Sequence, residues 1–194
     1  MMDEFIYIDH TFTQLVKFDA QIGNREFDGC TFVNCEFSNS VFSECRFINC
    51  TFRDCNLSMA RLPKTVLENA IFKDCKLLGI RFGECDDFLF KPDFYGCTLD
   101  YSWFSGKKMQ KAIFDGSSLK NVNFSHCDLT AALFSNTNLD GAIFDNTILK
   151  SVDFETAYNY QIDPQYNPMA GAKFSTHGLS GLLTKYDIRI EPLS

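Results

Sequence analysis

Residues 27–52 read FDGCTFVNCEFSNSVFSECRFINCTF, and phenylalanine recurs there at every fifth position. Cysteine stands two residues before a phenylalanine at Cys30, Cys35, Cys45 and Cys50. A period of five matches neither the 3.6 residues of an α-helix nor the two-residue alternation of a strand. A short fixed period instead predicts a repeat architecture, in which every unit places similar side chains in the same slots.

The same pattern continues on both sides of this stretch. A large apolar residue keeps the phase from Phe27 to Phe82 and, after a shift of two residues, from Phe94 to Phe154. If that residue is position i, position i−2 is small, and positions i−1, i+1 and i+2 are mostly polar. Such a unit turns two side chains inward and three outward, which predicts a chain wound around a narrow core with its turns stacked as a solenoid. Residue types in the second block recur every ten and twenty residues, so each turn holds an even number of units. The period leaves two or four units per turn open.

The phase shift falls near residues 83–93, within the segment GECDDFLFKPDF. We expect a bulge or a short loop there, between two stacks. The residues of this loop that would project are Asp86, Asp87, Phe88 and Phe90.

The tail of the chain has a different pattern. Leu179, Leu182, Leu183 and Tyr186 have helical spacing, with Ser175 or Thr176 placed to cap the helix. The segment YDIRIE at 186–191 then alternates like a short strand. Gly178 and Gly181 argue against a stable helix.

The units SVFSE, CTFRD, CNLSM and AIFKD resemble the pentapeptide-repeat family, whose pattern is A(D/N)LXX with Phe or Leu at the centre. The resemblance covers about residues 10–155. It implies an all-β, right-handed quadrilateral β-helix with four units per turn, and therefore roughly seven turns and a rod roughly 35 Å long. We expect residues 1–156 to form this β-helix and residues 157–194 to form a connection, a capping helix and a dimerisation strand.

The residues that could form a metal, redox or catalytic site give no sign of one. All nine cysteines stand at position i−2, so we interpret them as small buried hydrophobes rather than metal ligands or redox centres. His10, His126 and His177 are far apart in sequence, and we find no catalytic arrangement and no glycine-rich phosphate loop. We therefore expect no enzyme activity, no cofactor and no metal.

The charge and hydropathy of the chain argue against a nucleic-acid-binding, membrane or secreted protein. The net charge of −7 argues against direct nucleic-acid binding. There is no apolar run long enough for a membrane span and no signal-peptide pattern at the start, so we expect a cytoplasmic protein. The balance of charge is most one-sided in residues 121–172, which carry six acidic side chains and a single lysine.

Two longer stretches, residues 52–82 and NYQID followed by AKFSTHGLSGLLTKYDIRIE, resemble the topoisomerase-protecting members of the family: the albicidin-resistance protein, the Qnr quinolone-resistance group and a microcin immunity protein. That resemblance implies a DNA mimic that binds DNA gyrase or topoisomerase IV and protects it from inhibitors, and a homodimer joined through the C-terminal module. The acidic residues offered to the topoisomerase would be Asp128, Asp140, Asp145, Asp153 and Glu155. The dimer contacts would be Leu179, Leu182, Leu183, Tyr186, Ile188 and Ile190.

Alternatives remain open at this point. The acidic segment also fits the solvated faces of a plain rod, and the C-terminal module fits a cap on the last turn. A rod of 35 Å would need roughly 20 charges to match duplex DNA along its whole length, so any mimicry must be local. The competing functional hypothesis is an interaction scaffold whose partner is not a topoisomerase.

Overall fold

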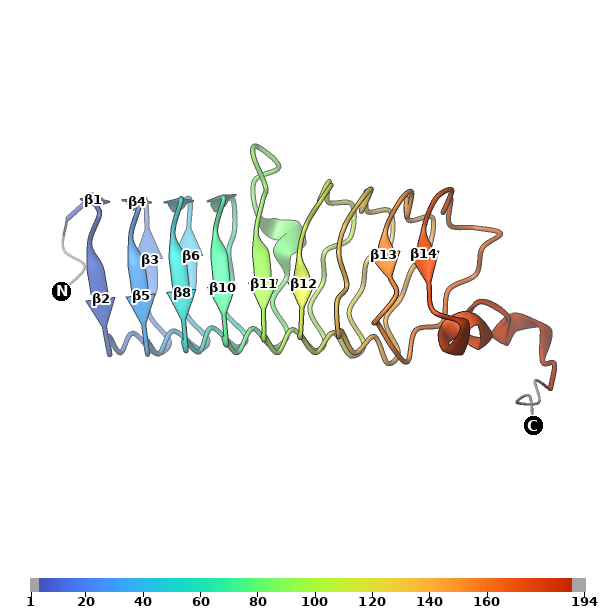
Figure 1. Ribbon diagram of the computed structural model, residues 1–194. Coiled ribbons are helices and arrows are strands. Elements are labelled where there is room, and N and C mark those ends of the chain that lie inside the picture. The colour runs from blue at the N-terminus through green and yellow to red at the C-terminus, as the bar shows by residue number, and fades with distance from the viewer. Residues whose placement is uncertain (1–3, 190–194) are drawn as a thin grey trace.

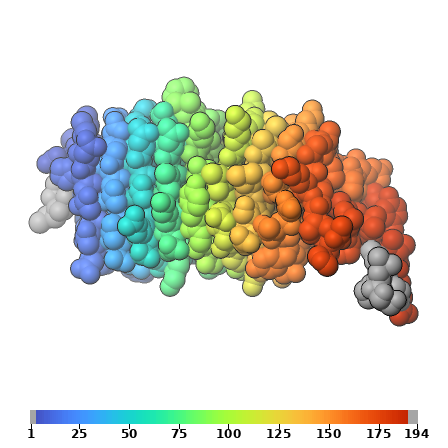
Figure 2. Space-filling view, viewed as in Figure 1, coloured from blue at the N-terminus to red at the C-terminus, as the bar shows by residue number. Residues whose placement is uncertain are grey.

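The computed structural model describes residues 4–189 of the 194-residue chain. The chain is a right-handed quadrilateral β-helix of about eight turns, with its two ends at opposite ends of a straight rod (Figure 1). Successive turns lie beside one another as parallel bands along the rod (Figure 2). Among the described residues, no helix is long and apolar enough to cross a membrane.

Each turn has four faces, which we number in chain order. The described strands are all short, and they lie on three of these faces. Face 1 contains β1 (Ile6–Ile8), β4 (Glu26–Asp28), β7 (Arg46–Ile48) and β9 (Val66–Glu68). Face 2 contains β2 (Thr11–Thr13), β5 (Thr31–Val33), β8 (Thr51–Arg53), β10 (Ile71–Lys73), β11 (Asp93–Tyr95), β12 (Phe114–Asp115), β13 (Asp153–Phe154) and β14 (Lys173–Phe174). Face 4 contains β3 (Gln21–Gly23) and β6 (Val41–Ser43), and face 3 is joined by isolated parallel bridges.

The register between turns shows how many units each turn holds. Phe12 pairs with Phe32, and Phe32 with Phe52, always in parallel. Twenty residues therefore separate neighbouring turns, which means four five-residue units per turn rather than two.

Stacked phenylalanines form the core. On face 2 the ring centroids of successive turns are 4.6 Å apart at Phe32 and Phe52 and 5.4 Å apart at Phe72 and Phe94, with nearly parallel planes. Rings on adjacent faces meet edge to face, as Phe27 and Phe32 do. Each buried ring contributes about 1.5–3 kcal/mol through its removal from water, so the stack is the main source of stability.

The small inward residues form a second ladder, made of hydrogen bonds. The side chain at i−2 donates to the carbonyl oxygen of an inward residue in the preceding turn. Cys50 Sγ donates to the Phe27 carbonyl at 3.2 Å, and Thr147 Oγ1 donates to the Phe124 carbonyl at 2.8 Å. All nine cysteines are buried and unpaired as disulfides. Their prediction as residues of the inner wall is confirmed, and many of them are also donors.

Position i+2 has a backbone requirement of its own. Residues at this position have positive φ in turn after turn, as at Asn34 (φ 52°), Asn39 (φ 57°) and Gly29 (φ 62°). Asparagine, aspartate and glycine adopt this left-handed conformation at least cost. The polar character of i+2 therefore reflects the corner of each unit as well as its exposure to solvent.

The phase shift is a loop, as the sequence predicted. Phe72 pairs with Phe94, a step of 22 residues instead of 20. The 3-10 helix η1 (Phe82–Glu84) leads into a segment that projects beyond the neighbouring turns just before β11 (Figure 1). Phe88 is exposed on it, but Phe90 is buried against the Phe82 ring, 6.3 Å between centroids. Phe90 was expected to project; it instead fills an inward slot, because the loop returns to the coil there.

The coil continues for one turn beyond Phe154. Phe154 pairs with Phe174 in the same 20-residue register, although residues 157–172 no longer follow the five-residue pattern. Two 3-10 helices follow, η2 (Thr176–Leu182) and η3 (Thr184–Tyr186), with the Ser175 hydroxyl accepting a hydrogen bond from the Gly178 N–H. Residues 187–189 are not in a strand. The remainder of the strand expected over 186–191 lies outside the described residues.

Candidate functional site

The five acidic residues predicted from the sequence do not share one surface. Asp128 lies on face 1 and Asp145 on face 4, whereas Asp153 and Glu155 flank the inward Phe154 on face 2. Asp140 lies on face 3, and it lines a hollow near the C-terminal end together with Glu155. Three of the five are therefore near one another, and two are on other sides of the rod.

Some of these carboxylates are already engaged. Asp153 forms an ion pair with Lys173 at 3.5 Å. Burial opposes ionisation of Asp128, but hydrogen bonds from Thr130 and Gln110 outweigh it and lower the pKa of that carboxyl. Asp128 is thus held in place by its own turn and the preceding one, which makes it a poor candidate for a free contact with a partner.

The structure adds two carboxylates that the sequence did not single out. Asp93 and Asp115 are on face 2, on the same side as Asp153 and Glu155. We call Asp93, Asp115, Asp153 and Glu155 the acidic strip. No lysine or arginine occupies an outward position of face 2 between Asp93 and Glu155. The net charge of consecutive residues conceals this strip, because residues 61–120 are basic as a whole. Comparing the charges of residues twenty positions apart, which lie on the same face, would have revealed it.

The carboxylates of the strip are unevenly spaced: Asp93 and Asp115 lie on successive turns, the turn of Phe134 carries no charge on this face, and Asp153 and Glu155 share the next turn. Its four carboxylates span three steps between turns, which at about 4.8 Å per turn is roughly 14 Å. On average that is about one charge per 4–5 Å, of the same order as the one phosphate per 3.4 Å along a single strand of duplex DNA. Asp93 also accepts a hydrogen bond from the Ile113 N–H at 3.0 Å, and burial raises the pKa of its carboxyl. The Asp93 carboxyl therefore ionises less readily than a free aspartate.

The projecting loop has an anchor in the neighbouring turn of the coil. Lys107 stands at position i−2, where the adjacent turns have Cys85 and Cys127, and its side chain is only 3% exposed. Its ammonium group donates to the Cys85 carbonyl at 2.7 Å and to Asp87 Oδ1 at 2.5 Å, and lies 5.0 Å from the centre of the Phe90 ring. The loop is thus tied at three points to one buried cation, while the side chains of Asp86, Asp87 and Phe88 are exposed, as predicted.

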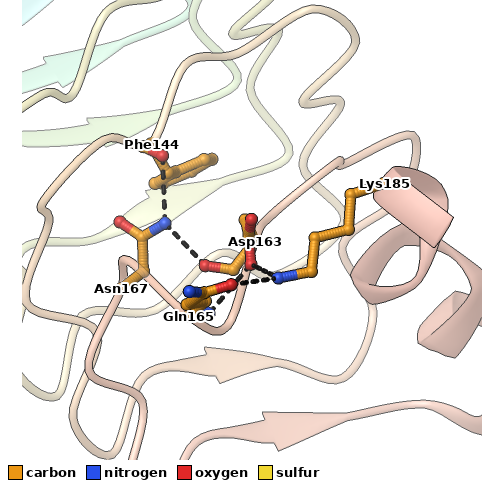
Figure 3. A network of polar contacts seen from close by, with 5 residues as sticks. All are labelled: Phe144, Asp163, Gln165, Asn167 and Lys185. Carbon is orange, nitrogen blue, oxygen red and sulfur yellow. Dashed lines mark hydrogen bonds and ion pairs between the residues drawn. The ribbon is translucent and has the colours of Figure 1, made fainter.

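The C-terminal helices dock on the last turn through polar contacts (Figure 3). Lys185 Nζ donates to Asp163 Oδ1 at 2.7 Å and to Gln165 Oε1 at 3.0 Å. The hydrogen bond from Lys185 lowers the pKa of Asp163, and the same contact raises the pKa of Lys185. On the other side of Asp163 from Lys185, the fully buried Asn167 donates to the Phe144 carbonyl at 3.0 Å, which ties the segment to the preceding turn.

The glycines that weakened the helix prediction prove to be necessary for docking. A Cβ atom at Gly181 would lie 2.2 Å from the Tyr160 carbonyl oxygen, and one at Gly178 would lie 1.9 Å from the Tyr160 hydroxyl. The Gly181 carbonyl also accepts from the Ile162 N–H at 3.0 Å. Helix η2 can approach the last turn this closely only because both residues lack a side chain.

The predicted dimer residues divide into two groups. Leu182 packs against the core, which fits a cap, and Leu183 is partly buried. Leu179, Tyr186 and Ile188 are exposed to solvent at 45%, 59% and 55%. Ile190 lies outside the described residues. The three exposed apolar side chains all belong to the C-terminal segment of the chain.

Comparisons with known proteins agree with this architecture. The family model for the pentapeptide repeat region matches residues 25–104, and the model for pentapeptide repeats (8 copies) matches residues 93–130 and 127–157. No curated protein sequence matches the chain significantly. Among solved structures, a trypsin-treated form of QnrB1, a plasmid-mediated fluoroquinolone resistance protein, has a TM-score of 0.75 at 16% identity, over 94% of this chain and 99% of that chain. A second trypsin-treated form of QnrB1 has a TM-score of 0.69 at 16% identity, over 96% and 98%.

Proposed function

Because this chain belongs to the pentapeptide-repeat family, we propose that it is a non-enzymatic DNA mimic that binds DNA gyrase or topoisomerase IV and modulates it or protects it from inhibitors of the quinolone or albicidin type. The acidic strip is the observation that carries this proposal. Its four carboxylates would occupy positions that the phosphates of one DNA strand take on the positively charged surface of the topoisomerase. The QnrB1 likeness supports the fold on which this rests, and the resistance named for QnrB1 suggests the class of partner.

The mechanism we propose is competition with the DNA duplex. Several carboxylates held at fixed spacing by stacked turns lose little conformational freedom on binding, which favours association. The cost of desolvating them is met only by cations of the partner, so binding should be strongly salt dependent. The mimicry is local, since the strip covers one face over about three turns. A continuous match to both strands is not required.

The test is a gyrase supercoiling assay with the purified protein, with and without a quinolone or albicidin. We expect inhibition, or protection from the poison, at micromolar protein. The double variant Asp115→Asn/Glu155→Gln should lose most of the effect, because it halves the charge of the strip. Its matched control is Asp128→Asn/Asp145→Asn, which removes the same charge from faces 1 and 4 and should keep the effect. The proposal fails if the parent neither inhibits nor protects, and the assignment to the strip fails if both variants behave alike.

A second candidate function is an interaction scaffold for a partner other than a topoisomerase. The observation that favours it is an exposed aromatic and basic surface away from the acidic strip, which includes Tyr101, Trp103 and Arg81. It predicts a protein that leaves supercoiling unchanged and is recovered from cell extract with a defined partner.

A further inference from the structure

The edge between faces 3 and 4 exposes an unusual group of side chains in the middle of the rod. Met59, Leu78, Tyr101 and Trp103 are 55%, 37%, 58% and 51% exposed on three neighbouring turns. Single exposed apolar residues are common on protein surfaces, whereas contiguous groups mark binding sites. We call these four residues, with Arg61 and Arg81, the aromatic–arginine patch.

The repeat places these residues together. Tyr101 and Trp103 are the outward neighbours of the inward Ser102, so both point away from the core at one corner of the turn. Arg81 forms a parallel bridge with Trp103, and its guanidinium carbon lies 5.9 Å from the centre of the indole ring. Met59 stands one turn further toward the N-terminus, above Gly79.

Gly79 creates a notch within the patch. It occupies the left-handed corner position with φ of 69°, and a Cβ atom there would lie 2.6 Å from the Met59 sulfur. The hollow over it is lined by Met59, Ala60, Arg61, Gly79, Arg81 and Glu84. An apolar side chain of a partner would enter this notch, with methionine, a residue that adapts its shape readily, on one wall.

The charges of the patch define the partner further. Arg61 pairs with Glu84 at 3.2 Å, whereas no carboxylate lies within ion-pair distance of Arg81 in the part of the chain that the structure describes. Arg81 is therefore a cation available to a ligand. Tryptophan, tyrosine and arginine are also the residues most enriched among those that dominate binding energy in protein interfaces.

From these observations we infer that the aromatic–arginine patch is a docking surface for an acidic protein segment that inserts an apolar side chain beside a carboxylate. The apolar side chain would contact Trp103 and the notch, and the carboxylate would pair with Arg81. A single-stranded nucleic acid also stacks on aromatic residues, but it needs a continuous basic groove. Here Glu84 and Asp100 interrupt the basic residues, which favours a peptide. The patch is on a different side from the acidic strip, so both surfaces can be occupied at once.

Trp103 is the only tryptophan of the chain, so its fluorescence reports directly on this surface. The experiment titrates the full chain with three probes: an octapeptide of glutamate, aspartate and phenylalanine, the same peptide with lysine at every acidic position, and an eight-nucleotide oligothymidylate. We expect a saturable change in emission with the acidic peptide alone. Arg81→Glu should weaken that binding at least tenfold, and Tyr101→Ser should weaken it severalfold. Arg53→Glu, an exposed arginine on face 2 with the same change of charge, should leave it unaltered.

Each other result overturns the inference. The absence of any emission change with the acidic peptide at millimolar concentration, or equal binding of the basic peptide, excludes the proposed ligand. Tighter binding of the oligonucleotide assigns the patch to nucleic acid instead. Emission that changes on dilution of the protein alone assigns it to contacts between copies of the chain. None of these readouts involves a topoisomerase, so the inference is tested separately from the proposed function.

Discussion

Lys107 differs from the residues that occupy the same column in the neighbouring turns. Thr65, Cys85 and Cys127 are small, and Thr65 and Cys127 donate to a carbonyl one turn away. Lys107 has a longer reach, so it bonds the Cys85 carbonyl and the loop carboxylate of Asp87 as well. The loop is therefore held by one side chain that is not part of it.

We expect Lys107→Met to free the loop without unfolding the rod. The Asp87 carboxylate is 88% exposed and regains water when the ammonium is lost, so we expect a cost of about 1–3 kcal/mol, mainly from the Cys85 carbonyl that loses its donor. The loop loses its tie at Asp87, so amide exchange at residues 86–89 should accelerate while exchange in the stacked turns stays unchanged. Cys127→Ala, in the same column but without a loop contact, is the control. Equal exchange at the loop in Lys107→Met and the parent would mean that the loop is held by its own packing.

A second prediction at this scale concerns the thiols. Burial raises the pKa of Cys50, Cys85 and Cys127 to about 12, so these thiols stay protonated at neutral pH. The thiolate is the form that alkylates. We expect iodoacetamide at pH 8 to modify them only at the rate of unfolding, measured by mass spectrometry with and without denaturant. Fast modification in the native protein would show that the inner column opens.

Substitution of one of these cysteines should affect stability rather than binding. Cys50→Ser keeps a donor for the Phe27 carbonyl, in the same way that Ser102 serves Leu77 at 2.8 Å. Cys50→Ala loses both the donor and the sulfur, and we expect a cost of about 1 kcal/mol. Chemical denaturation should rank the parent and Cys50→Ser together above Cys50→Ala. A drop in partner binding for a folded Cys50→Ala would contradict a purely structural role.

At the scale of elements, the sequence predicted the regular stack of turns better than the loop near residues 83–93 and the last turn, residues 157–174. A period of five with large, small and polar positions determines which side chains face inward, and it located the phase shift. It could not show that Phe90 returns to the core or that a turn forms from residues 157–174, since neither follows the period. The acidic strip was missed for a different reason: charge was added along the chain, whereas Asp93 and Asp153 lie three turns apart on one face and come together only when residues are compared in steps of twenty.

The contact between helix η2 and the last turn predicts a sharp effect of a single methyl group. Gly181→Ala places a Cβ where only about 2.2 Å separates it from the Tyr160 carbonyl oxygen, so the helix must move away. We expect destabilisation of about 1–3 kcal/mol, as for other overpacked sites. The control is Gly83→Ala, whose Cβ would meet nothing closer than the Ser105 carbonyl oxygen at 3.6 Å. Thermal unfolding should separate the two variants; similar midpoints would refute the close contact.

The ion pair between Asp163 and Lys185 gives the same docking contact a pH dependence. The lowered pKa of Asp163 means that its contribution is complete above the ordinary carboxyl pKa and is lost as the pH falls through its folded value. The pKa of Lys185 is raised, so its ammonium is charged and stabilises the docked helix at neutral pH. This stabilisation is lost only as the pH rises through the raised pKa. Docking should therefore weaken below about pH 4. An NMR titration of the Lys185 amide should show the change, and Asp163→Asn should abolish it; a titration that survives in Asp163→Asn would implicate another group.

At the scale of the whole molecule, the exposed Leu179, Tyr186 and Ile188 predict a homodimer through the C-terminal end. Light scattering should give twice the 22.2 kDa of the chain. Leu179→Asp should yield a monomer, since it places a charge in the interface at a side chain that is 45% exposed. Leu182 is less suitable for this test because it packs against the core. A parent that runs as a monomer rejects the dimer, and an unchanged mass in Leu179→Asp places the interface elsewhere.

The parallel stacking of turns also has a mechanical consequence. The hydrogen bonds between turns run along the rod, and the two ends of the chain lie at opposite ends of it, so a pulling force would load one turn after another rather than all at once. Each released turn of 20 residues would lengthen the chain by roughly 60–65 Å, the extended length less the rise of one turn. The turn that contains the projecting loop would release two residues more. Under tension the turns should therefore unfold one by one from the ends of the rod, and the length of the chain should increase in steps of nearly equal size.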